Sequence, residues 1–506
     1  MNRKLQKECE SSCEYILPDY LGDVKKLIST SAKVVPSGQF EGDGVIDCAG
    51  IVAYDVVYLD SENKLSSASF SSDYDFSLGK NDESYKDAYV SSSVGNFTIR
   101  LTGPRRMIAK AYVSSSVTLM ESFEPSVLGN VFGESEEPEK ITEILEIESS
   151  LKGESLEREY AEEIASLEGI SADEIEVITS SAYVRISESI PVEDGVNIKG
   201  ELVITAIIRT PDTSVFAIRR EIPFDETVSV NGANRDMSAI SDAFVSSLSL
   251  AINDEEGASQ VVANVIMELG SQTYFNESVE IVKDAYLKTK ETVAEYKNLD
   301  FSKHVTAETK SGSINIKMPL AELDLGSLKE VLSLCQDFRG LTLENDGKNP
   351  KFVGEIAFSG VACEILEGEE ENITSLKFNV PVSIDVNIGC QIPEKSELYA
   401  RILPAGVEWE LDDENLSIKL WYTVTFSLGE VKDARCLASC DVVGDFEYAR
   451  TPSKISVYFP SESESLFDIA KKFHTSVKDI AADNMISEPT ALGIPSKSGF
   501  KKLIIR

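Results

Sequence analysis

The stretch that decides the fold is DGVNIKGELVITAIIRTPDTSVFAIRREIPF, residues 194–224. Apolar and polar residues alternate along it, and a polar turn at Pro211 to Thr213 divides it into two runs. The apolar phase holds Val196, Ile198, Leu202, Ile204, Ala206 and Ile208, and the polar phase holds Asn197, Lys199, Glu201, Thr205 and Arg209. Alternation with a period of two is typical of a strand with one buried face. We therefore predict a β-hairpin with one face in a core and the other in solvent.

Two further segments follow the same plan. They are GVIDCAGIVAYDVVYLDSENKLSSASF at residues 44–70 and GEIAFSGVACEILEGEEENITSLKFNV at residues 354–380. Aligning the three copies places Gly50, Gly200 and Gly360 at equivalent positions, with polar turns at residues 60–63 and 368–372. A repeat of this kind predicts three β-sandwich-like domains of one topology, each with its own core.

A short segment of similar pattern precedes each copy and predicts a helical turn. It begins at Asp23, Asp173 and Ser327. The first two lie 27 residues before their glycine (23 to 50, 173 to 200), whereas the third lies 33 residues before Gly360. This difference predicts an insertion in the third copy, at the turn residues of 344–351.

The segment Glu134 to Glu168 separates the first two copies. It holds thirteen glutamates and three basic residues, with Ile141, Ile144 and Leu145 at helical spacing. We predict an acidic helical connector there. Its charge fits a solvated surface helix or a tether, and a docking motif is the alternative.

Two short capped helices are predicted near residue 470, in VYFPSESESLFDIAKKFHTSVKDIAADN at 457–484, ahead of GFKKLIIR at 499–506. Ser465 with Asp468, and Ser476 with Asp479, form the S-x-x-D pattern of a capping box. Apolar runs at residues 455–459 and 502–505 predict a strand on either side. The fold class is thus mainly β, with domains at 1–133, 169–298 and 299–450, short helices, the connector at 134–168, and a βααβ domain at 453–506.

Composition narrows the class of partner. The chain has 48 basic and 86 acidic residues, a net charge of −38, so it repels nucleic acid and anionic lipid. Proteins and neutral glycans remain. The sequence shows no signal peptide and no apolar run of membrane-spanning length, and its eight cysteines are dispersed, which together predict a cytoplasmic protein without a disulfide framework.

No catalytic constellation is visible. The two histidines, His304 and His474, fall in different predicted domains, and we interpret His474 as a structural residue in the turn between the helices. No phosphate-binding loop follows a strand. We predict no enzymatic activity, no cofactor and no metal site. Trp409 and Trp421 fit core packing, although an exposed tryptophan on such a strand would make a protein anchor.

The motifs resemble two known families. L-x-x-I-A-K-K-F at 466–473 and V-x-x-I-A-x-x-N at 477–484 are similar to a LysM domain. ILPDYLGDVKKLI at 16–28 and EIPFDETVSVNGANRDM at 221–237 look like the SPOCS domain of clostridial spore-coat proteins. The order of domains resembles the SPOCS and LysM spore-coat morphogenetic proteins of clostridia. This likeness implies a non-enzymatic scaffold in the mother-cell cytoplasm, at the forespore surface, with the basement-layer ATPase of the coat as a partner.

The alternative function is LysM-mediated binding of peptidoglycan, an N-acetylglucosamine polymer, in the cell wall or spore cortex. LysM domains that bind glycan have G-D-T-L before the first helix, where this chain has residues 463–466, Ser-Glu-Ser-Leu. Loss of the glycine hinders close backbone approach to a sugar. We therefore predict weak glycan binding and a protein-binding surface formed by Glu464, Ser465, Asn484, Met485 and Ile486.

Overall fold

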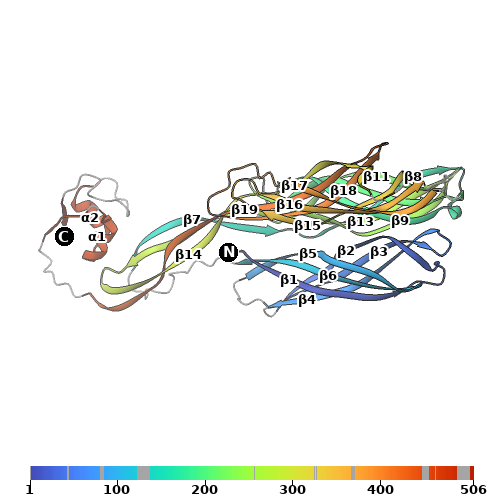
Figure 1. The fold of residues 1–506 in the computed structure, drawn as a ribbon. Helices are drawn as coiled ribbons and strands as arrows, with labels where there is room; N and C mark the ends of the chain where they lie inside the picture. Colours follow the sequence, from blue (N-terminus) through green and yellow to red (C-terminus); the bar gives the residue numbers. More distant parts are fainter. Residues whose placement is uncertain are drawn as a thin grey trace. The chain divides into compact units, whose positions relative to one another are not determined.

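The computed structural model describes residues 2–42, 45–79, 85–121, 137–212, 214–255, 257–323, 325, 327–365, 371–446, 455–461, 463–486 and 502–506. Long β-strands dominate, and two short helices, α1 (Leu466–Phe473) and α2 (Val477–Asp483), lie late in the chain (Figure 1). The prediction of a mainly β protein is confirmed. The chain divides into two compact units, which are described separately.

Unit 1 comprises Met1–Ser122, Ser149–Phe275 and His304–Glu430. It holds three hairpin sheets, each of three strands. They are β2 (Val24–Gly42), β3 (Val45–Asp60) and β4 (Leu65–Gly79); β9 (Glu176–Val192), β10 (Gly195–Arg209) and β11 (Val215–Ser229); and β15 (Ser327–Glu344), β16 (Lys351–Ile365) and β17 (Glu371–Asp385). In each sheet the middle strand pairs antiparallel with both neighbours, so the three predicted hairpins are confirmed.

Three further sheets accompany the hairpin sheets. One contains β1 (Asn2–Ile16), β6 (Arg106–Glu121) and β5 (Tyr85–Gly103), in that order. Another contains β12 (Ser238–Glu255), β13 (Ala258–Tyr286) and β7 (Glu139–Lys152), with β8 (Leu156–Glu168) also paired to β13. The last contains β14 (Lys290–Pro319), β19 (Asn415–Asp445) and β18 (Ser396–Leu411). The strands β7, β13, β14 and β19 contribute residues to both units.

The predicted connector is a pair of strands, not a helix. β7 and β8 fill residues 139–152 and 156–168, and both pair with β13. Glutamate favours helices, but pairing with β13 supplies hydrogen-bond partners for the backbone N–H and C=O groups of this segment. That pairing outweighs the local helix preference. The second sheet system therefore begins well before residue 169. Residues 134–136 of the predicted connector lie outside the described residues.

A shared β-bulge relates the three hairpin sheets. Ile28, Ile178 and Leu332 are each left without a partner where the register of the first strand shifts against the middle strand. Counting 22 positions from each bulge reaches Gly50, Gly200 and Gly354 (28 to 50, 178 to 200, 332 to 354). The third equivalent glycine is thus Gly354, and the predicted equivalence of Gly360 was wrong by six positions.

This register contradicts two other predictions made from the sequence. With Gly354 as the anchor, Ser327 also lies 27 residues before its glycine (327 to 354), so no insertion is needed. The predicted helical turns are strand in the first and third copies, and the second has one 3-10 turn at Ala172–Glu174. A bulge interrupts strict alternation and places apolar residues at spacings that imitate a helix, which explains the misassignment.

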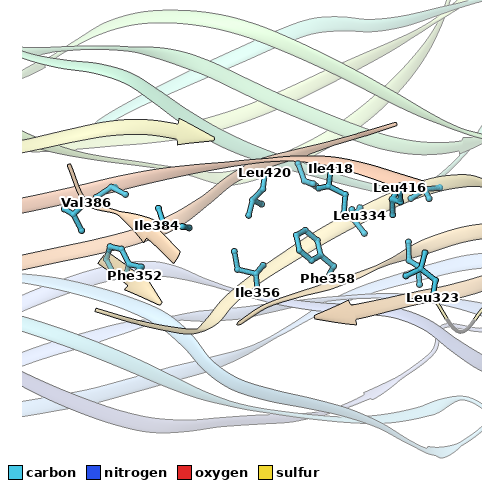
Figure 2. Close-up of a cluster of buried hydrophobic side chains, with 14 of the residues drawn as sticks. Leu323, Leu334, Phe352, Ile356, Phe358, Ile384, Val386, Leu416, Ile418 and Leu420 are labelled. Carbon is cyan, nitrogen blue, oxygen red and sulfur yellow. The ribbon is translucent and has the colours of Figure 1, made fainter. Parts of the chain in front are cut away.

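Each hairpin sheet buries one face in its own core. Separate apolar clusters surround Tyr54 in the first copy, Ile204 in the second and Ile356 in the third. Figure 2 shows the third, where Ile356 and Phe358 of β16 lie in one cluster with Ile384 of β17 and Leu420 of β19.

Part of the other face of the hairpin sheets is buried, which corrects our prediction of a solvent face, although Lys199 and Glu201 on β10 remain partly exposed. Bulged and middle-strand residues of all three copies meet in one further cluster. Its buried members are Ile28, Val57, Leu59, Leu65, Ile178, Ile207, Leu332 and Val361. The third strand of each sheet also contacts the first strand of the next, as β4 with β9, β11 with β15, and β17 with β2. The three sheets therefore close a cyclic arrangement within unit 1.

Unit 2 comprises Phe123–Glu148, Asn276–Lys303 and Val431–Arg506. Its strand portion is held by a cluster of Leu145, Ile147, Ile281, Phe301 and Cys436. The helices α1 and α2 lie in the chain between β20 (Ser456–Tyr458) and β21 (Leu503–Ile505), which pair antiparallel. This last module holds all the residues that we predicted to bind a partner.

Candidate interaction site

The two helices begin where their caps predict. The Ser465 hydroxyl accepts a hydrogen bond from the Asp468 backbone N–H, and the Asp468 carboxylate accepts one in return from the Ser465 backbone N–H, which completes a capping box. At α2 the Ser476 hydroxyl accepts from the Asp479 backbone N–H at 3.0 Å. These bonds use the backbone donors that a helix start leaves free.

A small apolar core holds the module together. It is formed by Leu466, Phe467, Ile469, Ala470, Ile480, Leu503 and Ile505, with Phe473, Val477 and Ile486 packed at its edge. Of these, Leu466, Ile469, Ala470, Phe473, Val477 and Ile480 follow the helical spacing of apolar residues in the sequence, which predicted them correctly. Phe467 lies outside that spacing and was not predicted.

Glu464 is held by neighbouring groups. Its carboxylate accepts hydrogen bonds from the Tyr458 hydroxyl at 2.7 Å and the Ser461 backbone N–H at 2.8 Å. The bond from the Ser461 backbone, then that from Tyr458, lowers the pKa of Glu464. A lowered pKa stabilises the fold above the ordinary value of 4.5, and this contribution is lost as the pH falls through the lower folded-state value. Glu464 thus braces the loop before α1.

Asn484 is also structural. Its side-chain amide donates to the carbonyls of Ile480 and Ile504 and accepts from the Ile504 backbone N–H, at 2.7 to 2.8 Å. One side chain therefore ties the end of α2 to β21. Ser465 is buried in its cap, and Ile486 packs on the core.

Of the five residues predicted to bind a partner, Met485 alone has a side chain that is almost fully exposed to solvent. Its side chain is 94% exposed, and its backbone has a left-handed φ of 54° at the end of α2. An exposed methionine is an adaptable apolar contact. The other four hold the local structure around it.

An apolar stripe at β20 was not predicted from the sequence. Ile455, Val457 and Phe459 alternate along this short strand and its two flanking positions, and they are 62%, 54% and 70% exposed. Period-two spacing puts the three side chains on one face, and that alternation was the available signal. The prediction placed the strand in the core packing of the helices, whereas the structure leaves this face of it open.

Unit 1 contains cavities between the hairpin sheets. One of about 690 Å³ is lined by residues of all three sheets and by Trp409 and Trp421. The Trp409 indole N–H donates to the Val331 carbonyl at 2.9 Å, and that of Trp421 to Glu408 at 2.6 Å. Both indoles are therefore bonded inside unit 1, which favours core packing over an exposed anchor.

Arg185 lines this cavity and is paired with neighbouring side chains. Its guanidinium lies 3.9 Å above the Trp421 ring, and Nη1 donates to Glu201 at 2.7 Å. Cation–π stacking and ion pairing in a buried setting hold neighbouring sheets in register. We interpret this cluster as structural.

The two histidines have structural partners. His304 Nε2 lies 2.9 Å from the Ser238 hydroxyl, and its ring stacks on Tyr274. His474 ends α1 with a left-handed φ of 50° and stacks on Phe446. Within the residues that the structure describes, no group of histidine, cysteine and carboxylate side chains is arranged to hold a metal. In the same part of the chain, no helix is long and apolar enough to cross a membrane.

Comparison with known proteins identifies two domains. A family model described as "SipL, SPOCS domain" matches residues 174–253, and one described as "LysM domain" matches residues 462–494. No curated protein and no solved structure matches the chain. Both matched domains are binding domains rather than catalytic ones, and they are of types linked to sporulation and to cell-wall binding. This chain thus contains a SPOCS domain at 174–253 and a LysM domain at 462–494.

Proposed function

We propose that this protein is a non-enzymatic scaffold in spore-coat assembly. It recruits coat morphogenetic proteins to the forespore surface from the mother-cell cytoplasm, with the basement-layer ATPase of the coat as a partner of the LysM domain. The observation that carries the proposal is the pairing of a SipL-type SPOCS domain with a LysM domain that exposes Met485 and the apolar stripe of Ile455, Val457 and Phe459. Apolar contacts of this kind suit a protein partner.

All three sheet systems of unit 1 are proposed to be SPOCS domains. The family model covers the second copy only. The common bulge at Ile28, Ile178 and Leu332, and the common spacing to a glycine, support extending it to the other two. A family that builds one chain from three copies of a domain gains several attachment surfaces, which is what a scaffold requires.

The second candidate function is glycan binding by the LysM domain. The family match favours it, because LysM domains bind N-acetylglucosamine polymers. The Ser463 to Leu466 loop departs from the glycan-binding pattern, and Glu464 in this loop is engaged by Tyr458 and Ser461. We therefore expect weak or no binding of N-acetylglucosamine oligomers to the full chain in calorimetry. Micromolar affinity would overturn the protein-binding assignment.

Replacing Met485 with aspartate should weaken capture of the partner from sporulating cells by about tenfold. A charge at the centre of an apolar contact must be desolvated without a counter-charge, which costs on the order of 1 to 3 kcal/mol. The measurement is the amount of coat protein co-purified with the tagged full chain. Because Met485 is exposed, the fold should be unchanged.

The matched control is Ile16→Asp, which changes another exposed apolar residue, in unit 1. Capture should be retained with this variant. Equal loss with both variants would mean that general surface polarity, not the LysM surface, governs recruitment.

A further inference from the structure

The LysM helices pack against another part of the same unit. Tyr286, at the end of β13, is 1% exposed and shares a core cluster with Phe467 of α1 and Ile141 of β7. Its ring meets Phe467 edge to face, with 5.1 Å between centroids. Its hydroxyl donates to the Thr475 carbonyl at 2.5 Å. A buried tyrosine with a satisfied hydroxyl is a specific anchor, because it combines apolar burial with one directed bond.

An ion pair lies beside this anchor. Lys471 Nζ is 2.7 Å from both carboxylate oxygens of Asp284, and Asp284 also accepts from the Tyr296 hydroxyl at 2.9 Å. Burial lowers the pKa of Lys471, but the hydrogen bond and charge of Asp284 more than offset this, so that the pKa is raised. A raised pKa means that the contribution is complete below the ordinary value of 10.5 and is lost only at higher pH. The pair is therefore intact at neutral pH.

The turn between the helices completes the contact. His474 Nδ1 lies 3.2 Å from the Leu287 carbonyl, and its ring stacks on Phe446 with 3.6 Å between centroids. Phe446 is itself fastened by its backbone N–H to the Thr289 carbonyl at 2.9 Å. Aromatic stacking and hydrogen bonding thus hold both ends of the turn that joins α1 to α2.

We propose that the segment Asp284 to Leu287 is a built-in partner of the LysM domain. This latch occupies the face of α1 that carries Phe467 and Lys471 and the turn after it. It leaves exposed Met485 and the β20 stripe of Ile455, Val457 and Phe459. External partners can therefore reach these apolar residues but not the residues that the latch covers, and the LysM domain depends on the strands of unit 2 for its stability.

Three further observations support this assignment. The contact combines the buried ring of Tyr286, the ion pair of Asp284 with Lys471 and the stacking of His474 on Phe446, which is more than an incidental contact supplies. Its residues come from β13, the turn after it and the position after β19, so they are not local neighbours of α1 in sequence. The exposed Met485 and β20 stripe are apolar, whereas the latched contact contains the paired charges.

Charge reversal in the full chain tests the latch. Asp284→Lys and Lys471→Asp each place like charges together, so the backbone amides of α1 should exchange hydrogen at least about tenfold faster by mass spectrometry. The double variant Asp284→Lys with Lys471→Asp should restore protection to within about twofold. Lys478→Asp, an exposed charge reversal on α2, is the matched control and should leave α1 unchanged.

Three results would overturn the proposal. Unchanged exchange at α1 in both single variants would mean that the ion pair holds nothing, and failure of the double variant to recover would mean that the effect is not pairwise. These measurements need no partner, so they are independent of the proposed function. The third result is stronger partner capture by Lys471→Asp than by the natural chain, which would show that the latch covers the binding surface.

Discussion

Replacing Gly200 with alanine should lower the free energy of unfolding of unit 1 by about 3 kcal/mol. An added Cβ would lie 2.2 Å from the Arg185 carbonyl oxygen and 2.7 Å from the Phe224 ring. The carbonyl belongs to the backbone of β9 next to a bulge, so a side-chain rotation cannot relieve this contact. Urea unfolding followed by circular dichroism measures the loss.

Gly270→Ala is the control for this effect. Gly270 lies within β13, and an added Cβ there would meet no atom within 4 Å. Alanine also loses less conformational freedom than glycine on folding, so this variant should be neutral or slightly stabilising. A similar destabilisation at both positions would show that Gly200 is needed for flexibility rather than for close approach.

Replacing Ile207 with aspartate should cost about 4 kcal/mol and separate the three hairpin sheets. Ile207 is 2% exposed and lies where Ile178, Leu332 and residues of the first copy meet. A carboxylate there is buried among apolar side chains, and the nearby Arg209 guanidinium is already bonded to Glu176 and to the Leu65 carbonyl. The core of the second copy lies on the other face of β10, around Ile204, so its strands should persist.

Hydrogen exchange distinguishes this outcome from global unfolding. The backbone amides around Ile28, Ile178 and Leu332 should lose protection. The amides of the β10 and β13 residues whose side chains lie in the second core should keep it. Ile207→Val, which removes one methylene group, should cost about 1 kcal/mol and leave the pattern intact. Equal loss of protection in every strand would mean that the three copies do not have independent cores.

The LysM domain shows how much structure can be predicted from residues that are close together in the sequence. Its caps, helices and inner faces follow from residues within a few positions of each other, because hydroxyl caps and 3.6-residue spacing act locally. The role of Asn484 did not follow, since two of its three bonds reach Ile504 in a strand twenty residues away. The same holds for Tyr286, whose partner Thr475 lies 189 positions further on.

The sequence by itself determined the strands of the hairpins, the phase of their core faces and the two capped helices, because alternation and capping are encoded in adjacent residues. Tertiary structure alone decided three other features. Pairing with β13 placed an acidic, helix-favouring segment in the strands β7 and β8. The bulges at Ile28, Ile178 and Leu332 set the true equivalence to Gly354. The meeting of three outer faces buried Ile207, since whether a strand face is covered depends on what packs against it and not on its own pattern.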